Sequence, residues 1–364
     1  MILETLTAFS NHYGKDPDLV LAGGGNTSAK DSDILYIKAS GTALATIRAQ
    51  EFVAMDRGKL AAIMEKTYPV EDAPREAAAL ADLMQAKAPG QENKRPSVET
   101  LLHALFPTKF VLHLHPSRVN GLTCGRTGGS AVRELFPDAV WIETCKPGYI
   151  LAKLCKTRLD AYAQAAGRNA SVVFLQNHGV FFAADTPQEL DDLLQGVLRK
   201  LKSVCTAEPD LSPCVAEDAA FGAHLAALYG ENAAYCFHGG ADAVRFSQSR
   251  ASFEPLARPF SPDHIVYCKA YPLYLETQAD ADAAFAAYRD RYGFAPKLIY
   301  VRGGGFYTVS DTLSQAQTAS LLAQDAVKIA VYSRDFGGAN PMSEAMTDFI
   351  ANWEVESYRA KLAK

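Results

Sequence analysis

Residues 110–116, Phe-Val-Leu-His-Leu-His-Pro, restrict the folding of this chain more than any other segment. The segment is apolar, short and closed by proline, a pattern typical of a buried β-strand. Because alternate side chains of a strand share a face, His113 and His115 project side by side, about 7 Å apart along the chain. Two imidazoles at this spacing can converge on one metal ion. The alternative is that both rings pack in a core strand, which is costly when either is protonated.

Other strand-like segments alternate with helix-like segments along the chain. Short apolar runs predict strands over 34–38, 110–115, 171–175 and 298–301. Runs with helical periodicity predict helices over 98–105 and 187–204. This mixture predicts an α/β or α+β fold, and periodicity alone does not decide between the two. A length of 364 residues is about right for two domains.

Two pairs of segments resemble each other, which indicates an internal repeat. Residues 33–39 resemble 264–270. Residues 178–186 resemble 304–312, and each of these two segments follows an apolar strand and contains an Asp-Thr pair expected to start a helix. Chance similarity between two strand–turn–helix units is the alternative explanation.

If both matches are genuine, their offsets differ by 105 residues, so the second copy lacks that length in its middle. A stretch rich in Pro, Glu, Asp and Ser at 206–213 follows the expected helix and predicts a joint there. We therefore expect a first domain over residues 1–207 and a degenerate relative of it over 208–364.

The charge balance excludes several classes of partner. The formal net charge is −5, and no run of Lys and Arg is long enough to hold a nucleic-acid backbone or an anionic membrane. Residues 1–18 lack the pattern of a secretory signal, and no apolar run of about 18 residues predicts a membrane span. The seven cysteines are scattered and form no C-x-x-C pair. They predict reduced thiols and a cytoplasmic protein rather than a disulfide framework.

A third metal ligand is expected at His178. This residue follows an apolar strand and precedes Gly179, which permits a tight turn and a close approach of the backbone. Catalytic zinc usually takes three protein ligands and keeps one position open. In the expected second copy, the residue that corresponds to His178 is Gly304, and a histidine present in only one copy is better explained by chemistry than by packing.

Two glycine-containing turns are candidates for binding an anion. Residues 23–28, Gly-Gly-Gly-Asn-Thr-Ser, offer free backbone N–H groups and hydroxyls, which suit a phosphate. Residues 40–42, Ser-Gly-Thr, follow the expected strand 34–38 and form a possible second side of the same pocket. Neither turn matches a nucleotide-binding motif, and an ordinary turn is the alternative for each.

Glu99 lies where the helix expected over 98–105 begins, with Ser97 as a candidate N-cap. His103 is one helical turn away and is positioned to hold or orient the carboxylate. On local pattern alone, a solvated first-turn glutamate stabilised by the helix dipole is the better explanation.

Taken in order, five short motifs resemble those of the class II aldolase/adducin family over about residues 1–205. The motifs are Gly25-Asn26-x-Ser28, Ser40-Gly41, Ser97-x-Glu99, His113-x-His115 and Asn177-His178-Gly179. The remainder, including the 261–265 segment Ser-Pro-Asp-His-Ile and residues 336–353, resembles the aldolase half of bifunctional rhamnulose-phosphate aldolase/dehydrogenase proteins.

The resemblance implies a three-layer α/β/α fold around a mainly antiparallel sheet, in a homo-oligomer with its active site near a subunit interface. By position, His113, His115 and His178 match the family's zinc ligands, and Glu99 matches its catalytic carboxylate. The residues that match its phosphate cradle are Asn26, Ser28, Ser40, Gly41 and Ser97. The C-terminal half has no such histidines and is expected to be a metal-free relative.

The reaction implied is reversible retro-aldol cleavage of a ketose phosphate to dihydroxyacetone phosphate and an aldehyde. Zinc would act as a Lewis acid, and Glu99 would move a proton. Val98 stands where several sugar-phosphate aldolases have a second serine, so the phosphate is held differently or is missing from the substrate. Epimerisation and decarboxylation on the same zinc are alternatives. A non-catalytic, adducin-like interaction domain is a further one, but it would predict eroded metal ligands.

Overall fold

The computed structural model describes residues 2–352, which form two compact units. Unit 1 comprises Met1–Val119 and Gly129–Ser203, and unit 2 comprises Asn120–Gly128 and the chain from Val204 onward. Trp353, the last residue of the C-terminal resemblance, lies outside the described residues. No helix within 2–352 is long and apolar enough to span a bilayer.

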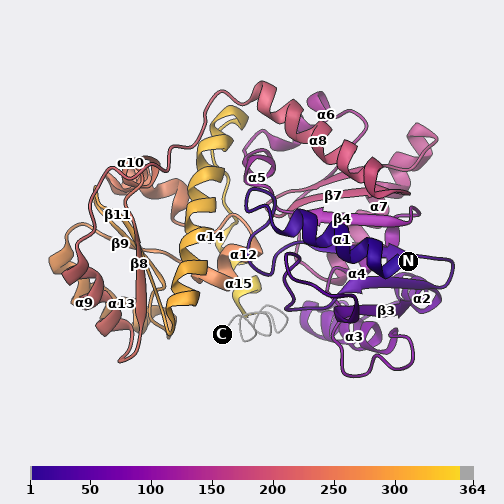
Figure 1. Ribbon diagram of the computed structural model, residues 1–364, viewed down its shortest axis with the longest axis horizontal. Coiled ribbons are helices and arrows are strands. Elements are labelled where there is room, and N and C mark those ends of the chain that lie inside the picture. The colour runs from indigo at the N-terminus through magenta and orange to yellow at the C-terminus, as the bar shows by residue number, and fades with distance from the viewer. Residues whose placement is uncertain (1, 353–364) are drawn as a thin grey trace. The chain divides into compact units, whose positions relative to one another are not determined.

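Unit 1 is built on a seven-stranded sheet of order β3-β2-β1-β4-β7-β6-β5 (Figure 1). Its strands are β1 Asn26–Lys30, β2 Ile34–Lys38, β3 Phe52–Asp56, β4 Phe110–Leu114, β5 Val140–Ile142, β6 Val172–Leu175 and β7 Gly179–Ala184. All neighbours pair antiparallel except β5 and β6, which are parallel. The expected mainly antiparallel sheet is confirmed.

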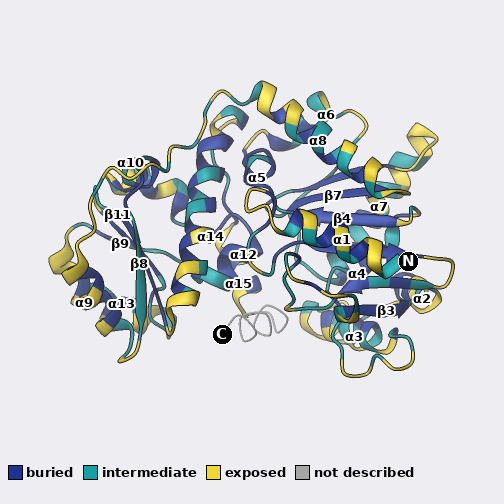
Figure 2. Ribbon diagram, viewed as in Figure 1, coloured by how far each residue is buried: buried dark blue, intermediate teal, exposed yellow. Residues whose placement is uncertain are grey.

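Helices cover both faces of this sheet. The helices of residues 2–204 are α1 Ile2–Gly14, α2 Arg57–Glu65, α3 Asp72–Gln85, α4 Thr100–Leu105, α5 Ser117–Thr123, α6 Gly128–Leu135, α7 Tyr149–Ala166 and α8 Pro187–Val204, and α5 runs on into unit 2. Helices α2, α3, α4 and α7 pack with the sheet in one large buried core (Figure 2). On the other face, the Phe9 ring of α1 packs edge-on against Phe110, and Tyr13 donates to Asp191 of α8. The expected three-layer arrangement is confirmed.

The five elements of this unit that local pattern predicted have boundaries within two residues of the expected ones. Strand β2 and helix α8 match the expected 34–38 and 187–204, and β4 and β6 each lack one residue of the expected range. Helix α4 begins at Thr100, two residues later than expected, because residues 97–100 first form a turn in which the Ser97 carbonyl accepts from Thr100 N–H at 3.1 Å.

Unit 2 contains a four-stranded sheet of order β8-β11-β10-β9. Its strands are β8 Ala234–His238, β9 Leu273–Leu275, β10 Leu298–Val301 and β11 Gly305–Ser310. The helices are α9 Ala219–Tyr229, α10 Ala241–Ser247, α11 Arg250–Phe253, α12 Pro262–Cys268, α13 Ala281–Tyr292, α14 Leu313–Tyr332 and α15 Glu344–Asn352. Helix α9 contributes to a core with β10 and β11, and α14 contacts β8 and β11.

The sheet of unit 2 has the topology of four strands of unit 1. In both β4-β7-β6-β5 and β8-β11-β10-β9, the first two pairings are antiparallel and the last is parallel. The hairpin pairs Leu175 with Gly179 in unit 1 and Val301 with Gly305 in unit 2, an offset of 126 residues. Asp-Thr precedes the following helix in both, as expected: α8 begins at Pro187 and α14 at Leu313.

The first of the two sequence matches is wrong. Residues 34–38 form strand β2, but Pro262–Cys268 form helix α12. The two segments share a short apolar pattern that suits either structure. Ser261 at the N-cap and Pro262 at the first helical position decide for a helix. As far as residue 352, unit 2 therefore has no counterpart of β1–β3, and the predicted 105-residue gap in its middle is also wrong.

Residues 120–128 belong to unit 2, which the sequence did not predict. Gly121 and Gly125 lie so close to Tyr332 and Phe336 that a Cβ at either position would clash with those side chains. Backbone bonds continue this contact, with Arg126 N–H donating to Gly338 at 3.0 Å. The two glycines allow residues 121–125 to lie directly against residues 332–336 within unit 2.

Candidate metal centre

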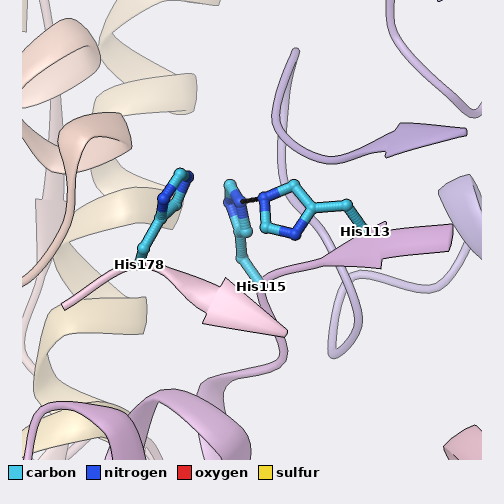
Figure 3. Close-up of side chains that lie close together, drawn as sticks. All are labelled: His113, His115 and His178. Carbon is cyan, nitrogen blue, oxygen red and sulfur yellow. Dashed lines mark hydrogen bonds between the residues drawn. The ribbon is translucent and has the colours of Figure 1, made fainter. Parts of the chain in front are cut away.

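Three histidines of unit 1 converge in the structure as their positions predicted. His113 is on β4, His115 follows the strand, and His178 lies in the turn between β6 and β7 (Figure 3). One ring nitrogen from each lies within 4.8 Å of those of the other two. The Nε2 atoms of His113 and His115 are 2.9 Å apart. This spacing suits imidazoles that share one ion, because zinc holds its nitrogen ligands at about 2.0–2.1 Å.

The orientation of the His113 ring is fixed on two sides. Its Nδ1–H donates to the Val180 carbonyl oxygen at 3.0 Å, which leaves the Nε2 lone pair for a metal. Phe181 is directly opposite in the strand register, and the two rings stack with centroids 4.0 Å apart. Burial lowers the pKa of His113 to about 4. The ring is therefore neutral at physiological pH, as a metal ligand must be.

The turn that presents His178 depends on its two neighbours. Asn177 adopts a left-handed conformation, with φ of 56°, and its Oδ1 accepts from Thr144 Oγ1 at 3.0 Å. A Cβ on Gly179 would lie 2.6 Å from the His115 ring and closer still to the Leu114 carbonyl oxygen. Only glycine therefore allows β7 to approach the end of β4 this closely.

Glu99 completes the cluster. Its Oε1 lies 3.3 Å from Nε2 of His113 and 3.1 Å from Nε2 of His178, yet it makes no hydrogen bond of acceptable geometry. The other oxygen accepts from the Asn26 side-chain amide. Burial raises the pKa of Glu99, and protonated His113 and His178 beside it would lower that pKa by more than burial raises it.

This donor set fits a divalent cation. Three neutral imidazoles leave one position open, the arrangement of a catalytic rather than a structural zinc site. A buried carboxylate oxygen without a well-formed hydrogen bond, beside two of those imidazoles, is the group that a bound cation would satisfy. Imidazole ligands also suit other transition metals, so the chemistry of the donors favours zinc without requiring it.

Strand β1 positions the helix that begins after Glu99. Asn26, Ser28 and Lys30 alternate along β1 and share one face. Ser28 Oγ lies 2.8 Å from Nδ1 of His103, and Lys30 Nζ donates to the His103 carbonyl at 2.9 Å. The expectation that His103 orients Glu99 is wrong, because Ser28 takes up the His103 ring and Asn26 holds the carboxylate.

The other predicted phosphate-binding residues lie on two joined loops. Ser40 N–H donates to the Arg95 carbonyl at 2.8 Å, and Ser97 N–H donates to the Lys38 carbonyl at 3.2 Å. Gly41 is exposed and has φ of 85°. The structure thus brings Ser40, Gly41 and Ser97 into neighbouring loops. Ser28 is fully buried beneath α4, where it supports the helix rather than offering a hydroxyl to a ligand.

Two buried lysines were missed by the sequence analysis. Lys38 Nζ donates to the carbonyl of Gly23 at 3.0 Å and to that of Thr42 at 2.6 Å, so it ties the glycine-rich turn to the next loop. Lys30 holds the end of α4. Each lies in a strand where the neighbouring positions are apolar or small, and a lysine inside such a strand was the available signal.

Comparison with known proteins gives the family of unit 1. The family model described as "Class II Aldolase and Adducin N-terminal domain" matches residues 4–197. A relative from Bacillus subtilis (strain 168), "Uncharacterized oxidoreductase YuxG", is 21% identical over 419 aligned residues, which cover 99% of this chain and 58% of the relative. The chain therefore spans little more than half the length of that protein.

Several solved structures are similar to about half of the chain. The N-terminal class II aldolase domain of a Thermoplasma acidophilum protein is 26% identical, with a TM-score of 0.47, over 56% of this chain and 93% of that one. An L-fuculose 1-phosphate aldolase is 17% identical, with a TM-score of 0.37, over 56% and 84% of the respective chains. YgbL from Escherichia coli, a putative aldolase/epimerase/decarboxylase, is 16% identical, with a TM-score of 0.37, over 56% of this chain and 87% of that one. Because the family model covers more than half of its residues, the chain belongs to the class II aldolase/adducin family.

Proposed function

We propose that this protein is a zinc-dependent lyase that cleaves a ketose phosphate to dihydroxyacetone phosphate and an aldehyde by a reversible retro-aldol reaction. The observation that supports this is the cluster of His113, His115 and His178 with the Glu99 carboxylate against it. An interaction domain without catalysis has no need to keep three converging imidazoles and a buried carboxylate, which are costly to bury when unused.

The three histidines would hold the zinc through their unprotonated nitrogens. A zinc ion bound there would supply Lewis-acid stabilisation of the negative charge that develops on the substrate's ketone oxygen. Val180 keeps His113 in the required tautomer through the Nδ1–H bond. Phe181 and the β4–β7 pairing hold the ring in place, so the ligands are oriented before substrate arrives.

Glu99 would move the proton on the carbon next to the ketone. As a carboxylate it can remove that proton, which is the first step of condensation and the reverse of the last step of cleavage. Asn26 donates to one carboxylate oxygen and leaves the other directed at the histidines. Asn26, Ser40, Gly41 and Ser97 would bind the phosphate through amide, hydroxyl and backbone N–H groups.

The test combines metal content with turnover. Native protein without a polyhistidine tag should carry about one zinc per chain, and His113→Ala should lose it. Glu99→Gln keeps the shape of the side chain and should retain zinc while losing cleavage of ketose phosphates. Cleavage is measured by enzymatic detection of the dihydroxyacetone phosphate released. Turnover retained in Glu99→Gln would exclude Glu99 as the acid/base. Native protein without metal after zinc is supplied would contradict the proposal as a whole.

Val98 favours one second candidate. No hydroxyl is present at this position, beside Ser97, so the cradle has one donor fewer for a phosphate. A sugar acid without phosphate is therefore the second class of substrate to test, with decarboxylation or epimerisation as the reaction on the same zinc. Product analysis separates the three: an aldehyde, carbon dioxide or an epimer of unchanged mass.

The proposal extends to compartment and assembly. Cysteines outside disulfides, as all seven are here, are the rule in the cytoplasm. We place the protein there, as a homo-oligomer.

A further inference from the structure

Strand β8 forms one edge of the sheet of unit 2, and among residues 2–352 no strand pairs with its outer side. Its direction of pairing shows which backbone groups face outward. Val309 N–H donates to Lys297 on the β10 side, so Thr308 directs its backbone groups to β8. Thr308 is opposite Cys236, and Cys236 therefore pairs with β11. The N–H and C=O groups of Tyr235 and Phe237 alternate with it and face outward.

The chain itself covers only one end of this edge. Cys214 N–H and Val215 N–H both donate to the outward carbonyl of Gly239, at 2.8 and 3.2 Å, just beyond β8. Within residues 2–352, no other backbone segment or side chain bonds to the outward groups of Tyr235 and Phe237. Sheet edges are normally protected by charged residues, proline or a bulge. Residues 234–238, Ala-Tyr-Cys-Phe-His, contain no lysine, acid or proline, and all five are half-buried.

Unit 1 shows what such an edge accepts in this topology. Strand β4 has the place in unit 1 that β8 has in unit 2, and its outer side pairs antiparallel with β1. By the strand registers, His113 corresponds to Phe237, since their partners on β7 and β11 are Phe181 and Tyr307. His113 pairs with Asn26 of β1. The part of unit 2 that the structure describes has no counterpart of β1, so there the same edge lacks its antiparallel neighbour.

We propose that β8 pairs with β8 of a second copy of this chain, antiparallel about a twofold axis, to form one continuous eight-stranded sheet. A strand that pairs with itself antiparallel satisfies twofold symmetry, the commonest symmetry of protein dimers. One register uses both outward residues. With the axis at Cys236, Tyr235 of each copy is opposite Phe237 of the other, and the two pairs exchange four backbone hydrogen bonds.

This register makes a specific geometric prediction at Cys236. The two Cys236 residues become a directly opposed, non-hydrogen-bonded pair, with Cα atoms about 4.5 Å apart. That separation lies within the range that a disulfide spans. Cys236 is a free, half-buried thiol in this structure, and Cys214, close to the same edge, is a free and exposed one. Cys214 therefore serves as the control for non-specific crosslinking.

The test uses the full chain in two measurements. Diamide accepts two electrons and two protons from a pair of thiols, which become a disulfide. Mild oxidation with diamide should therefore give a covalent dimer that persists in Cys214→Ser and disappears in Cys236→Ser. In parallel, light scattering after gel filtration compares Cys236→Ser with Cys236→Asp, which puts two carboxylates opposite each other. Cys236→Ser should keep the mass of the native assembly, and Cys236→Asp should halve it, with circular dichroism confirming that both are folded.

Crosslinking that survives in Cys236→Ser overturns the proposal. So does a native monomer, or a mass that a folded Cys236→Asp leaves unchanged, because the edge would then be covered by another part of this chain or by a different protein. If Cys236→Asp fails to fold, the oxidation experiment decides, since it needs only the native chain and two serine variants.

Discussion

Gly179 gives the most direct test of how the backbone positions the candidate metal centre. Replacing it with alanine adds one methyl group where β7 meets the end of β4. That methyl would lie 2.6 Å from Cδ2 of His115, about 0.8 Å short of ordinary van der Waals contact at 3.4 Å, and closer still to the Leu114 carbonyl oxygen. A carbonyl within a paired strand cannot yield as a flexible side chain does, so β7 or the His115 ring has to shift.

The expected cost follows from this overlap. Forcing an extra methyl into a packed site typically costs about 1–3 kcal/mol of unfolding free energy, which outweighs the gain of about 0.4–1 kcal/mol from a less flexible unfolded chain. Zinc ligation tolerates distance errors of only about 0.2 Å. A shift of several tenths of an ångström in His115 should therefore weaken zinc binding at least about 10-fold. This is the lower end of the loss in metal affinity that follows mutation of residues supporting the ligands.

Two other glycines provide matched controls. Gly305 is the counterpart of Gly179 in unit 2, where a Cβ would lie 3.1 Å from Gly239 Cα and closer still to the His238 carbonyl oxygen. Gly305→Ala also places alanine at φ of 79°, so it should lose at least as much stability as Gly179→Ala and keep its zinc. Gly196 lies in α8 with nothing within 4 Å of a built Cβ, so Gly196→Ala should gain about 0.5–1 kcal/mol. Urea unfolding of metal-free protein and competition with a zinc chelator measure the two effects separately. If Gly179→Ala binds zinc as tightly as the parent, the close approach of β7 does not position the ligands.

Two further predictions concern the groups around the same site. Burial lowers the pKa of His113 to about 4, so between pH 6.5 and 4 the unfolded chain binds a proton that the folded chain does not. Metal-free protein should therefore lose stability as the pH falls through this window. His113→Asn should flatten the dependence of the urea midpoint on pH. Ser28→Ala leaves the fully buried His103 ring without its Nδ1 partner at 2.8 Å, which should cost about 1–3 kcal/mol of unfolding free energy. Ser32 is exposed, and Ser32→Ala should change the unfolding free energy by less than about 0.5 kcal/mol. Equal effects of the two substitutions in thermal unfolding would refute the supporting role assigned to Ser28.

The sequence predicted the three histidines because the information is local. An i, i+2 pair in a strand and a histidine before a turn glycine each follow from backbone geometry over a few residues. Their convergence on one point depends on the antiparallel pairing of β4 with β7, which brings His113 opposite Phe181. No local pattern predicts that pairing, so the expectation that His178 joins the other two histidines rested on the resemblance to known motifs.

Glu99 shows the limit of local pattern more clearly. At the start of a short helix it is typical of a solvated, dipole-stabilised residue. It lies at the candidate metal centre because β1 pairs with β4 and presents Asn26 and Ser28 to the helix beyond. The mistaken match of 33–39 with 264–270 has the same origin, since a five-residue apolar run suits a strand or a helix equally and only the capping residues decide.

The two units, compared position by position, separate what the hairpin needs from what the chemistry needs. Gly179 and Gly305 are both closely approached by the carbonyl of the neighbouring strand, and Asn177 and Gly303 share left-handed φ values of 56° and 64°. These constraints persist in unit 2, where the register puts Gly304 in place of His178. We propose that unit 2 is a degenerate relative of the second half of unit 1. The turn geometry is then a property of the sheet that exists without any ligand, and the histidines of unit 1 make use of it.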